Sequence, residues 1–307
     1  MLDEKTKKYI EAVADQFNKD AYSHSIKVSR IIKQLQGFID EEIELSKTRI
    51  EVLLDELVGF YTITLDIPLD SGTHIVRAVK FEEKESVIPC YEDVSRLSHI
   101  PTEESYKSKV GRLNKKKEVI FYGCLSDGKK QGISVAFAEI RVLEGELINV
   151  LKSITKEKIK VNYIGVFDHY KRGVPPPFEV HSNFELAYKY QESKFDNHLM
   201  IAYQLCDAFF SDILRTKKYG RLYEVTSVLA SLFLEGRDSI DGIIYSSVQS
   251  EGDPVIALKT STVTNKVEHI EAMSMVIEKD YGYAIYDAPT LFRGQIVDEK
   301  IKWTKEL

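Results

Sequence analysis

Cysteine is scarce in this sequence of 307 residues, which contains only Cys90, Cys124 and Cys206. An odd number of cysteines at wide spacing indicates neither a disulfide framework nor a cysteine-based metal site. Sparse, unpaired cysteines are typical of proteins in a reducing compartment, so we expect a cytoplasmic location.

Long apolar runs are also missing. No stretch approaches the roughly 18 uninterrupted apolar residues that a membrane-spanning helix requires. The first five residues are mostly charged and lack the apolar core of a signal peptide. We therefore expect no membrane partner.

The sequence has no excess of positive charge. Its 42 Lys and Arg residues are outnumbered by 48 Asp and Glu residues, which gives a net charge of −6. Proteins that bind nucleic acids gain affinity by neutralising phosphates, so this balance argues against a nucleic-acid partner. The basic run at residues 115–117 is a local exception, which a solvated turn explains.

Several catalytic motifs are absent from the sequence. There is no Gly-x-Gly-x-x-Gly of a Rossmann dinucleotide site and no Gly-x-Ser-x-Gly of a serine hydrolase. His169 and His181 each lack a second histidine three or four residues away, so they do not indicate a metal site. We expect no metal cofactor.

The N-terminal part of the sequence has a helical pattern. Apolar residues recur at helical spacing through residues 3–60, a stretch without proline. We predict an N-terminal helical segment at residues 1–60. Its apolar faces must pack on the main domain or on another copy of the chain, and the second option predicts a homo-oligomer formed through these helices.

From Tyr61 onward the pattern mixes strands, helices and a loop-rich stretch at residues 82–110, which favours an α+β domain. Apolar runs predict strands at residues 74–79, 119–122, 162–167, 243–248, 255–258, 267–273 and 281–286. Helical spacing predicts helices at residues 131–140, 184–214 and 227–234.

Arg77 lies inside an apolar run. In a strand at residues 74–79, Ile75 and Arg77 share one face, while His74, Val76 and Ala78 share the other. A lone arginine in a strand usually faces solvent or forms a salt bridge. If it is buried, it needs an anionic partner.

The stretch from Gly111 to Ile140 combines a predicted strand, a turn and a predicted helix. The strand ends in Tyr122 and the helix carries Glu139, so the phenol and the carboxylate can face one pocket. The same pattern occurs in ordinary scaffold, and the residues alone do not decide between the two.

Taken together, these segments resemble the RES domain family, which is named for an arginine, a glutamate and a serine. The resemblance covers residues 73–260. It is carried by Arg77 in the first strand, Gly111-Arg112-Leu113-Asn114 before the strand ending in Phe121-Tyr122, Glu139 in the next helix, Tyr223 with Thr226, and Asp241-Gly242-Ile243-Ile244-Tyr245-Ser246-Ser247.

The resemblance implies a fold similar to ADP-ribosyltransferases. Many RES proteins are bacterial toxins that degrade NAD, some attach ADP-ribose to proteins, and an antitoxin commonly restrains them. Compared with this family, the chain has extra N-terminal helices. It also has an insertion around residues 150–215, within a RES-like domain at residues 61–307.

Carried onto this chain, the resemblance implies an NAD site. Glu139 would stabilise the oxocarbenium-like charge that builds on the ribose as nicotinamide leaves. Arg77 and Arg112 would pair with the pyrophosphate. Tyr122 would stack on nicotinamide, and Ser247 or Ser246 would donate a hydrogen bond.

We therefore expect an enzyme that consumes NAD as a substrate, either an NAD glycohydrolase or an NAD phosphorylase. Two alternatives stay open, a protein ADP-ribosyltransferase and a non-enzymatic interaction scaffold. An antitoxin or another regulatory protein is the expected partner.

Overall fold

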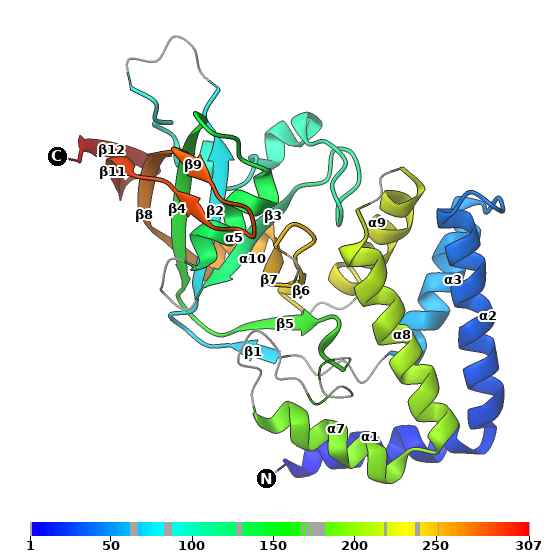
Figure 1. Cartoon of the computed structure of the whole chain (residues 1–307). Coiled ribbons are helices and arrows are strands. Elements are labelled where there is room, and N and C mark those ends of the chain that lie inside the picture. Colours follow the sequence, from blue (N-terminus) through cyan, green and yellow to red (C-terminus); the bar gives the residue numbers. More distant parts are fainter. Residues whose placement is uncertain are drawn as a thin grey trace. The chain divides into compact units, whose positions relative to one another are not determined.

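The computed structural model describes residues 2–61, 67–82, 88–126, 131–167, 169, 173, 182–217, 220–236, 240–250 and 252–306. The chain mixes helices with a large sheet, which confirms the predicted α+β class (Figure 1). It divides into two compact units. The helical unit comprises Met1–Ile67, Gly111–Leu113 and Asn162–Asp238, and the sheet unit comprises Pro68–Val110, Asn114–Val161 and Ser239–Leu307.

The helical unit is built from two groups of helices that are distant in sequence. Its helices are α1 (Glu4–Phe17), α2 (Ala21–Ile39), α3 (Lys47–Phe60), α7 (Ser182–Lys194), α8 (Asn197–Arg215) and α9 (Arg221–Leu234). Helix α1 packs on α7, α2 on α8, and α3 on α9. Residues 162–238 therefore join the N-terminal helices in one unit, a division that differs from the predicted boundary near residue 60.

Local capping decides where several of these helices begin. The predicted helix at residues 184–214 is interrupted, because the Asp196 side chain accepts a hydrogen bond from the His198 amide at 2.8 Å and starts a new helix there. The helix predicted from Ser227 begins earlier, at Arg221, so Tyr223 and Thr226 lie inside α9. Asp3 and Ser46 cap α1 and α3 in the same way.

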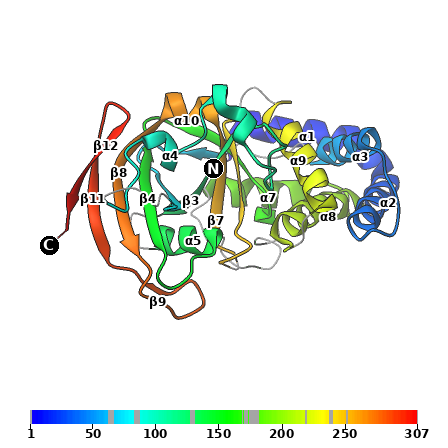
Figure 2. The same cartoon turned by 90° about the horizontal axis from the view of Figure 1, so that it is seen from above.

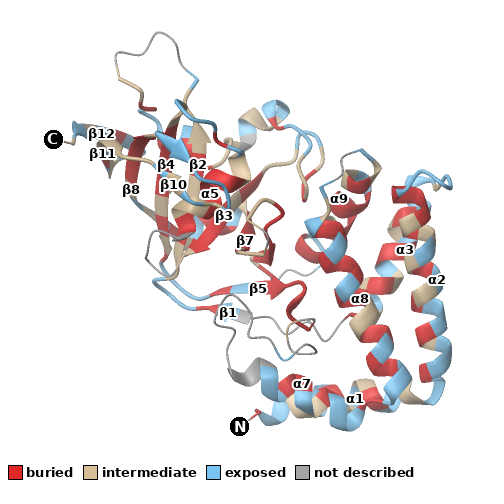
Figure 3. Ribbon diagram, viewed as in Figure 1, coloured by how far each residue is buried: buried red, intermediate tan, exposed pale blue. Residues whose placement is uncertain are grey.

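An aromatic cluster forms the core of the helical unit. The Tyr61 ring is buried and contacts the rings of Tyr203, Phe210 and Phe233. Its hydroxyl donates a hydrogen bond to the buried Asp207 carboxylate, which also accepts from the Gly165 amide at 2.8 Å. Burial and the neighbouring carboxylate raise the pKa of Tyr61 well above its ordinary value. The Tyr61 hydroxyl and the Gly165 amide thus satisfy the Asp207 carboxylate, which would be costly to bury without hydrogen bonds. Figure 3 shows the buried residues along α8 and α9.

A ten-stranded sheet runs in the order β1-β5-β6-β7-β3-β2-β4-β8-β11-β12. Its strands are β1 (Ile67–Leu69), β2 (His74–Lys80), β3 (Ile120–Ser126), β4 (Leu147–Thr155), β5 (Ile159–Tyr163), β6 (Gly242–Ser246), β7 (Pro254–Lys259), β8 (Val267–Val276), β11 (Thr290–Val297) and β12 (Lys300–Lys305). The eight strands that follow β5 in this sheet order, from β6 to β12, lie in the sheet unit. Each of them pairs antiparallel with its neighbours among these eight.

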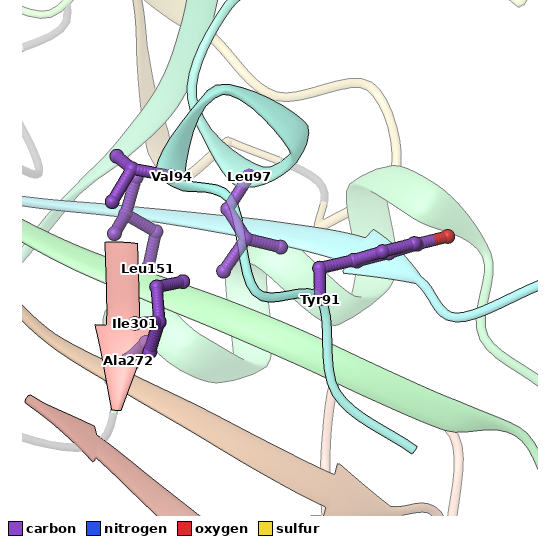
Figure 4. Close-up of a cluster of buried hydrophobic side chains, with 6 residues drawn as sticks. All are labelled: Tyr91, Val94, Leu97, Leu151, Ala272 and Ile301. Atoms are coloured by element: carbon purple, nitrogen blue, oxygen red, sulfur yellow. The ribbon is translucent and has the colours of Figure 1, made fainter. Parts of the chain in front are cut away.

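Short helices cover both faces of β2. Helix α5 (Gln131–Ile140) approaches the face that carries Val76 and Ser126, next to Gly132. Helix α4 (Val94–Leu97) packs on the opposite face, where Leu151 pairs with Arg77. Figure 2 shows α4 and α5 on either side of the strands. The cluster under α4 is drawn in Figure 4 and consists of Tyr91, Val94, Leu97, Leu151, Ala272 and Ile301.

Most sheet predictions are confirmed, with local differences. Helix α5 has the predicted limits, whereas β3 continues past the predicted end to Ser126. The strand predicted at residues 162–167 ends at Tyr163, because Gly165 turns the chain with a φ of 93°. The loop-rich stretch at 82–110 contains α4 and a 3-10 helix, η2 (Thr102–Lys107).

The strand predicted at residues 281–286 is wrong. Two short strands, β9 (Lys279–Asp280) and β10 (Tyr286–Asp287), pair with each other, and residues 281–285 form the turn between them. A short helix of seven residues, α10 (Thr260–Lys266), separates β7 from β8.

Some predicted features cannot be compared with the structure. Residues 127–130, in the turn between the predicted strand and helix of the Gly111–Ile140 stretch, and His181 lie outside the described residues. Among the helices of the described residues, none is long and apolar enough to cross a membrane.

Candidate functional site

The Glu139 carboxylate and the Ser247 hydroxyl form the centre of the candidate site. Ser247 Oγ donates a hydrogen bond to Glu139 Oε1, although the residues are 108 positions apart in sequence. The same oxygen accepts from the amides of Gln249 at 3.1 Å and Ser250 at 3.0 Å. Since these amides occupy the lone pairs of Ser247, its single proton is directed at the carboxylate.

The strand order explains why the two side chains meet. Ser247 follows β6, and its amide donates to the Asp253 carbonyl at 2.7 Å, which extends the β6–β7 pairing. Strand β7 pairs with β3, and α5 packs on β3. At Gly132, a Cβ atom would lie only 2.6 Å from Ser126 Cβ, so glycine permits the close approach of α5 that brings Glu139 towards Ser247.

The thiol of Cys124 in β3 interacts electrostatically with the charged residues of this site. Cys124 is buried, and burial raises the pKa of its thiol well above the ordinary value. The carboxylates of Glu139 and Asp253 raise this pKa further, whereas the Arg77 guanidinium lowers it. One buried atom therefore lies within electrostatic reach of both carboxylates and of the arginine. The thiol stays protonated there, so it is no nucleophile.

Arg77 lies where β2 and β3 separate. The ladder between these strands joins Val76 to Cys124, and the next residue of β2 is Arg77. Its Nη1 donates to the Tyr122 carbonyl at 2.7 Å, so the guanidinium continues the contact between the strands. Its Nε is buried and has no hydrogen-bond partner among the described residues. Burial lowers the pKa of Arg77 from its ordinary value.

The pleat of the sheet directs Arg77 and Tyr122 to different faces. Arg77 shares its face with Phe121, whose ring centroid lies 5.6 Å from Arg77 Cζ. Tyr122 and Cys124 share the opposite face with Val76, which is the face that α5 covers. The guanidinium therefore lies on the face opposite to α5, and its hydrogen bond to the Tyr122 carbonyl joins it to the strand that carries Tyr122 and Cys124.

Two histidines lie on the face of Arg77. Burial lowers the pKa of His99, and the charge of Arg77 lowers it further. His269 Nδ1 lies 2.8 Å from the buried Ser153 Oγ, and burial together with His99 lowers the pKa of His269 to about 4. This side of Arg77 thus has neutral imidazoles near pH 7, and they leave the positive charge of the guanidinium in place.

The Tyr122 hydroxyl is held by a buried asparagine. It donates to Asn114 Oδ1 at 2.8 Å, and Asn114 Nδ2 donates to the carbonyls of Lys109, Lys115 and Glu118 at 2.8, 3.0 and 3.1 Å. Asn114 thereby fastens the segment before β3 to the tyrosine ring, which is half-buried.

Arg112 belongs to the helical unit. Its guanidinium donates to the carbonyls of Ile213 at 3.3 Å and Thr216 at 3.2 Å, which lie at the C-terminal end of α8. Its Cζ lies 5.6 Å from the Tyr223 ring centroid, and its own carbonyl accepts from Thr226 Oγ1 at 2.5 Å. These contacts give Arg112 a structural role as a cap of α8.

Of the residues predicted for the site, Glu139, Ser247, Arg77 and Tyr122 all lie in the sheet unit. Ser246 and Ser247 are alternatives from the sequence, and the hydroxyl that bonds Glu139 is that of Ser247. Cys124, Asp253 and Asn114 are not among the predicted site residues. Only Asn114 has a signal in the sequence, which is its place in the Gly111–Asn114 motif.

No group of three or more histidine, cysteine, aspartate or glutamate side chains that could hold a metal ion is found in the described part of the chain. In the comparisons with known proteins, no family model, no curated protein and no solved structure matches this chain.

Proposed function

We propose that this protein is an NAD-consuming enzyme that cleaves the bond between nicotinamide and ribose, with an ADP-ribosyltransferase-like arrangement of its sheet unit. The observation that carries the proposal is the hydrogen bond from Ser247 to Glu139. The resemblance to RES domains names these two residue types as partners in one site, and here they are in direct contact despite their distance in sequence.

The proposed chemistry follows from the charge of Glu139. Departure of nicotinamide leaves an electron-poor ribose, and a fixed carboxylate beside C1 stabilises the positive charge as it develops. Because Ser247 is itself anchored by two main-chain amides, it holds the carboxylate in one orientation and spares the cost of reorganisation during the reaction.

Arg77 supplies the positive charge that a pyrophosphate requires. Its Nε is buried without a hydrogen-bond partner in the part of the chain that is described, and a guanidinium in that state gains from an anionic ligand. Asn114 fixes the Tyr122 ring in place through its hydroxyl, and a fixed aromatic ring suits stacking on nicotinamide.

The acceptor determines the class of enzyme. Water gives a glycohydrolase, phosphate gives a phosphorylase, and a protein side chain gives an ADP-ribosyltransferase. We propose water or phosphate as acceptor, with protein modification as the alternative. In the setting that the resemblance implies, the enzyme acts as a bacterial toxin or defence effector, and an antitoxin restrains it.

The test compares NAD loss in the wild-type protein and in Glu139→Gln. This substitution keeps the shape and the ability to accept from Ser247, and it removes only the charge. We expect NAD loss to fall by at least about a hundredfold, the scale seen when an electrostatic stabiliser is removed. Glu103→Gln, at an exposed position of the same unit, is the matched control. Equal activity in both variants would exclude Glu139 as the stabilising carboxylate.

A further inference from the structure

The β9–β10 hairpin displays large apolar side chains to solvent. Tyr283 at its tip is 95% exposed, and Tyr281 and Ile285 on either side are 62% and 59% exposed. Figure 2 shows the hairpin projecting beyond α5 at the edge of the sheet unit. A cluster of exposed aromatic and aliphatic side chains at a protruding tip is typical of an interaction surface.

The tip has a defined shape. The Gly282 amide donates to Asp280 Oδ1 at 2.8 Å, and the amides of Tyr281 and Ile285 each bond a carbonyl across the turn at 3.0 Å. Tyr283 has a φ of 54° and Ala284 a φ of 57°, values that cost energy in residues other than glycine. The backbone therefore keeps Tyr283 pointing outward at an energetic cost, which a binding role explains.

The hairpin is acidic. Residues 278–287 contain Glu278, Asp280 and Asp287 against the single Lys279, which is three negative charges and one positive, a net −2. Lys279 is also neutralised by Glu144 at 2.8 Å. Any partner of the tip must accordingly combine an apolar surface with positive charge.

The helical unit of the same chain contains a groove with this combination. The groove lies between α2 and α3 and has a volume of about 500 Å³. Its floor is formed by the buried side chains of Ile31 and Leu53, and Ile26 and Tyr22 line it at 37% and 63% exposure.

The rim of this groove is basic. Lys27, Arg30 and Arg49 oppose a single acid, Glu56, which gives a net +2. Lys27 is paired with Glu56 at 2.8 Å, and Arg49 donates to the neutral Gln34 at 3.2 Å. Within the described residues, neither Arg30 nor Arg49 has a carboxylate partner. The two arginines are therefore free to receive acidic groups.

We propose that the β9–β10 hairpin of one copy of this chain docks in the α2–α3 groove of a second copy. The tip supplies apolar side chains and a net −2, and the groove supplies an apolar floor and a net +2. Tyr283 enters the groove above Ile31 and Leu53, and acids of the hairpin meet Arg30 and Arg49. This contact joins two different surfaces, so repeated copies close into a ring where the rotation between them permits and otherwise extend head-to-tail, with one hairpin and one groove open at the ends.

The first test measures the mass of the full chain by sedimentation velocity from 1 to 200 μM, a range matched to standard affinities. We expect the mass to increase with concentration. Tyr283→Ser and the double variant Arg30→Glu/Arg49→Glu should each weaken association by at least about tenfold, as loss of a central aromatic or arginine anchor does. Tyr106→Ser, at another exposed tyrosine, which lies in η2, and Lys33→Glu, on the exposed surface of α2, should leave association unchanged.

Mixing the two defective variants tests whether the hairpin and the groove are the two halves of one contact. The Tyr283→Ser copy retains its groove, and the Arg30→Glu/Arg49→Glu copy retains its hairpin. The mixture should form a 1:1 dimer that grows no further. A wild-type chain that stays monomeric throughout, variants that associate like the wild type, or a mixture that stays monomeric would each overturn the proposal.

Discussion

The hydroxyl of Ser247 donates a hydrogen bond to the carboxylate of Glu139, a residue 108 positions away in the sequence. Two main-chain amides fix the serine oxygen, and the close packing of α5 at Gly132 fixes the helix that carries the carboxylate. Glu139 is therefore held in one orientation before any ligand binds. Preorganisation of this kind is what an electrostatic stabiliser of a cationic transition state requires.

Replacing Ser247 by alanine should lower both stability and NAD cleavage. The substitution leaves the amides of Gln249 and Ser250 without their acceptor, and unsatisfied buried groups cost about 1–3 kcal/mol in unfolding free energy. Urea unfolding and initial rates of NAD loss measure the two effects. Ser246→Ala, at the adjacent buried serine, is the control and should change the rate little. The same rate loss in both alanine variants would contradict a specific role for Ser247.

Replacing Arg77 by leucine should separate ligand binding from folding. The variant loses one hydrogen bond to the Tyr122 carbonyl, worth about 1 kcal/mol, and it also removes a desolvated charge whose burial is unfavourable. We expect a small net change in unfolding free energy and a KM for NAD raised at least about tenfold. An unfolded variant, or an unchanged KM, would make Arg77 a structural residue.

Replacing Tyr122 by phenylalanine should preserve most of the activity. The ring that stacks on nicotinamide remains, and only the hydrogen bond to Asn114 is lost, at about 1 kcal/mol of stability. Tyr122→Leu, which removes the ring, should instead lose activity. If the phenylalanine variant is as inactive as the leucine variant, the hydroxyl has the chemical role and stacking does not.

His269 should make stability depend on pH. Its pKa of about 4 in the folded state lies below the ordinary value of 6.5, so the unfolded state binds the proton first as pH falls. Stability that is present above pH 6.5 is thus lost between about pH 6.5 and 4, by up to about 3 kcal/mol. His269→Asn should flatten this part of the profile of unfolding free energy against pH. A wild-type profile that is already flat there would contradict the prediction.

Local sequence patterns were sufficient for many elements of the fold. The limits of α5 could be predicted because an apolar, alanine-containing run between turns forms a helix. The interruption at Asp196 and the turn at residues 281–285 could not, because capping and hairpin geometry compete with apolar patterns that look continuous. The joining of residues 162–238 with the N-terminal helices depends on packing between distant segments, which has no local signal.

For the candidate site, the sequence allowed only a prediction of which residues take part, based on the order of residue types along the chain. That order named Glu139 and left Ser246 and Ser247 as alternatives, and the structure adds that Ser247 is in contact with Glu139. It gave no indication of Cys124, a buried thiol whose pKa the carboxylates of Glu139 and Asp253 raise and the Arg77 guanidinium lowers. It also could not show that Arg77 and Tyr122 leave the sheet from opposite faces, since that depends on the register of β2 against β3.

The central claim is that this chain cleaves the bond between nicotinamide and ribose. The most direct measurement is a ¹H NMR time course of NAD with catalytic amounts of the purified wild-type protein, in which free nicotinamide has resolved signals. The account predicts that free nicotinamide appears in step with the loss of NAD, over many turnovers. NAD that stays intact with a protein whose cooperative unfolding shows it to be folded would contradict the account.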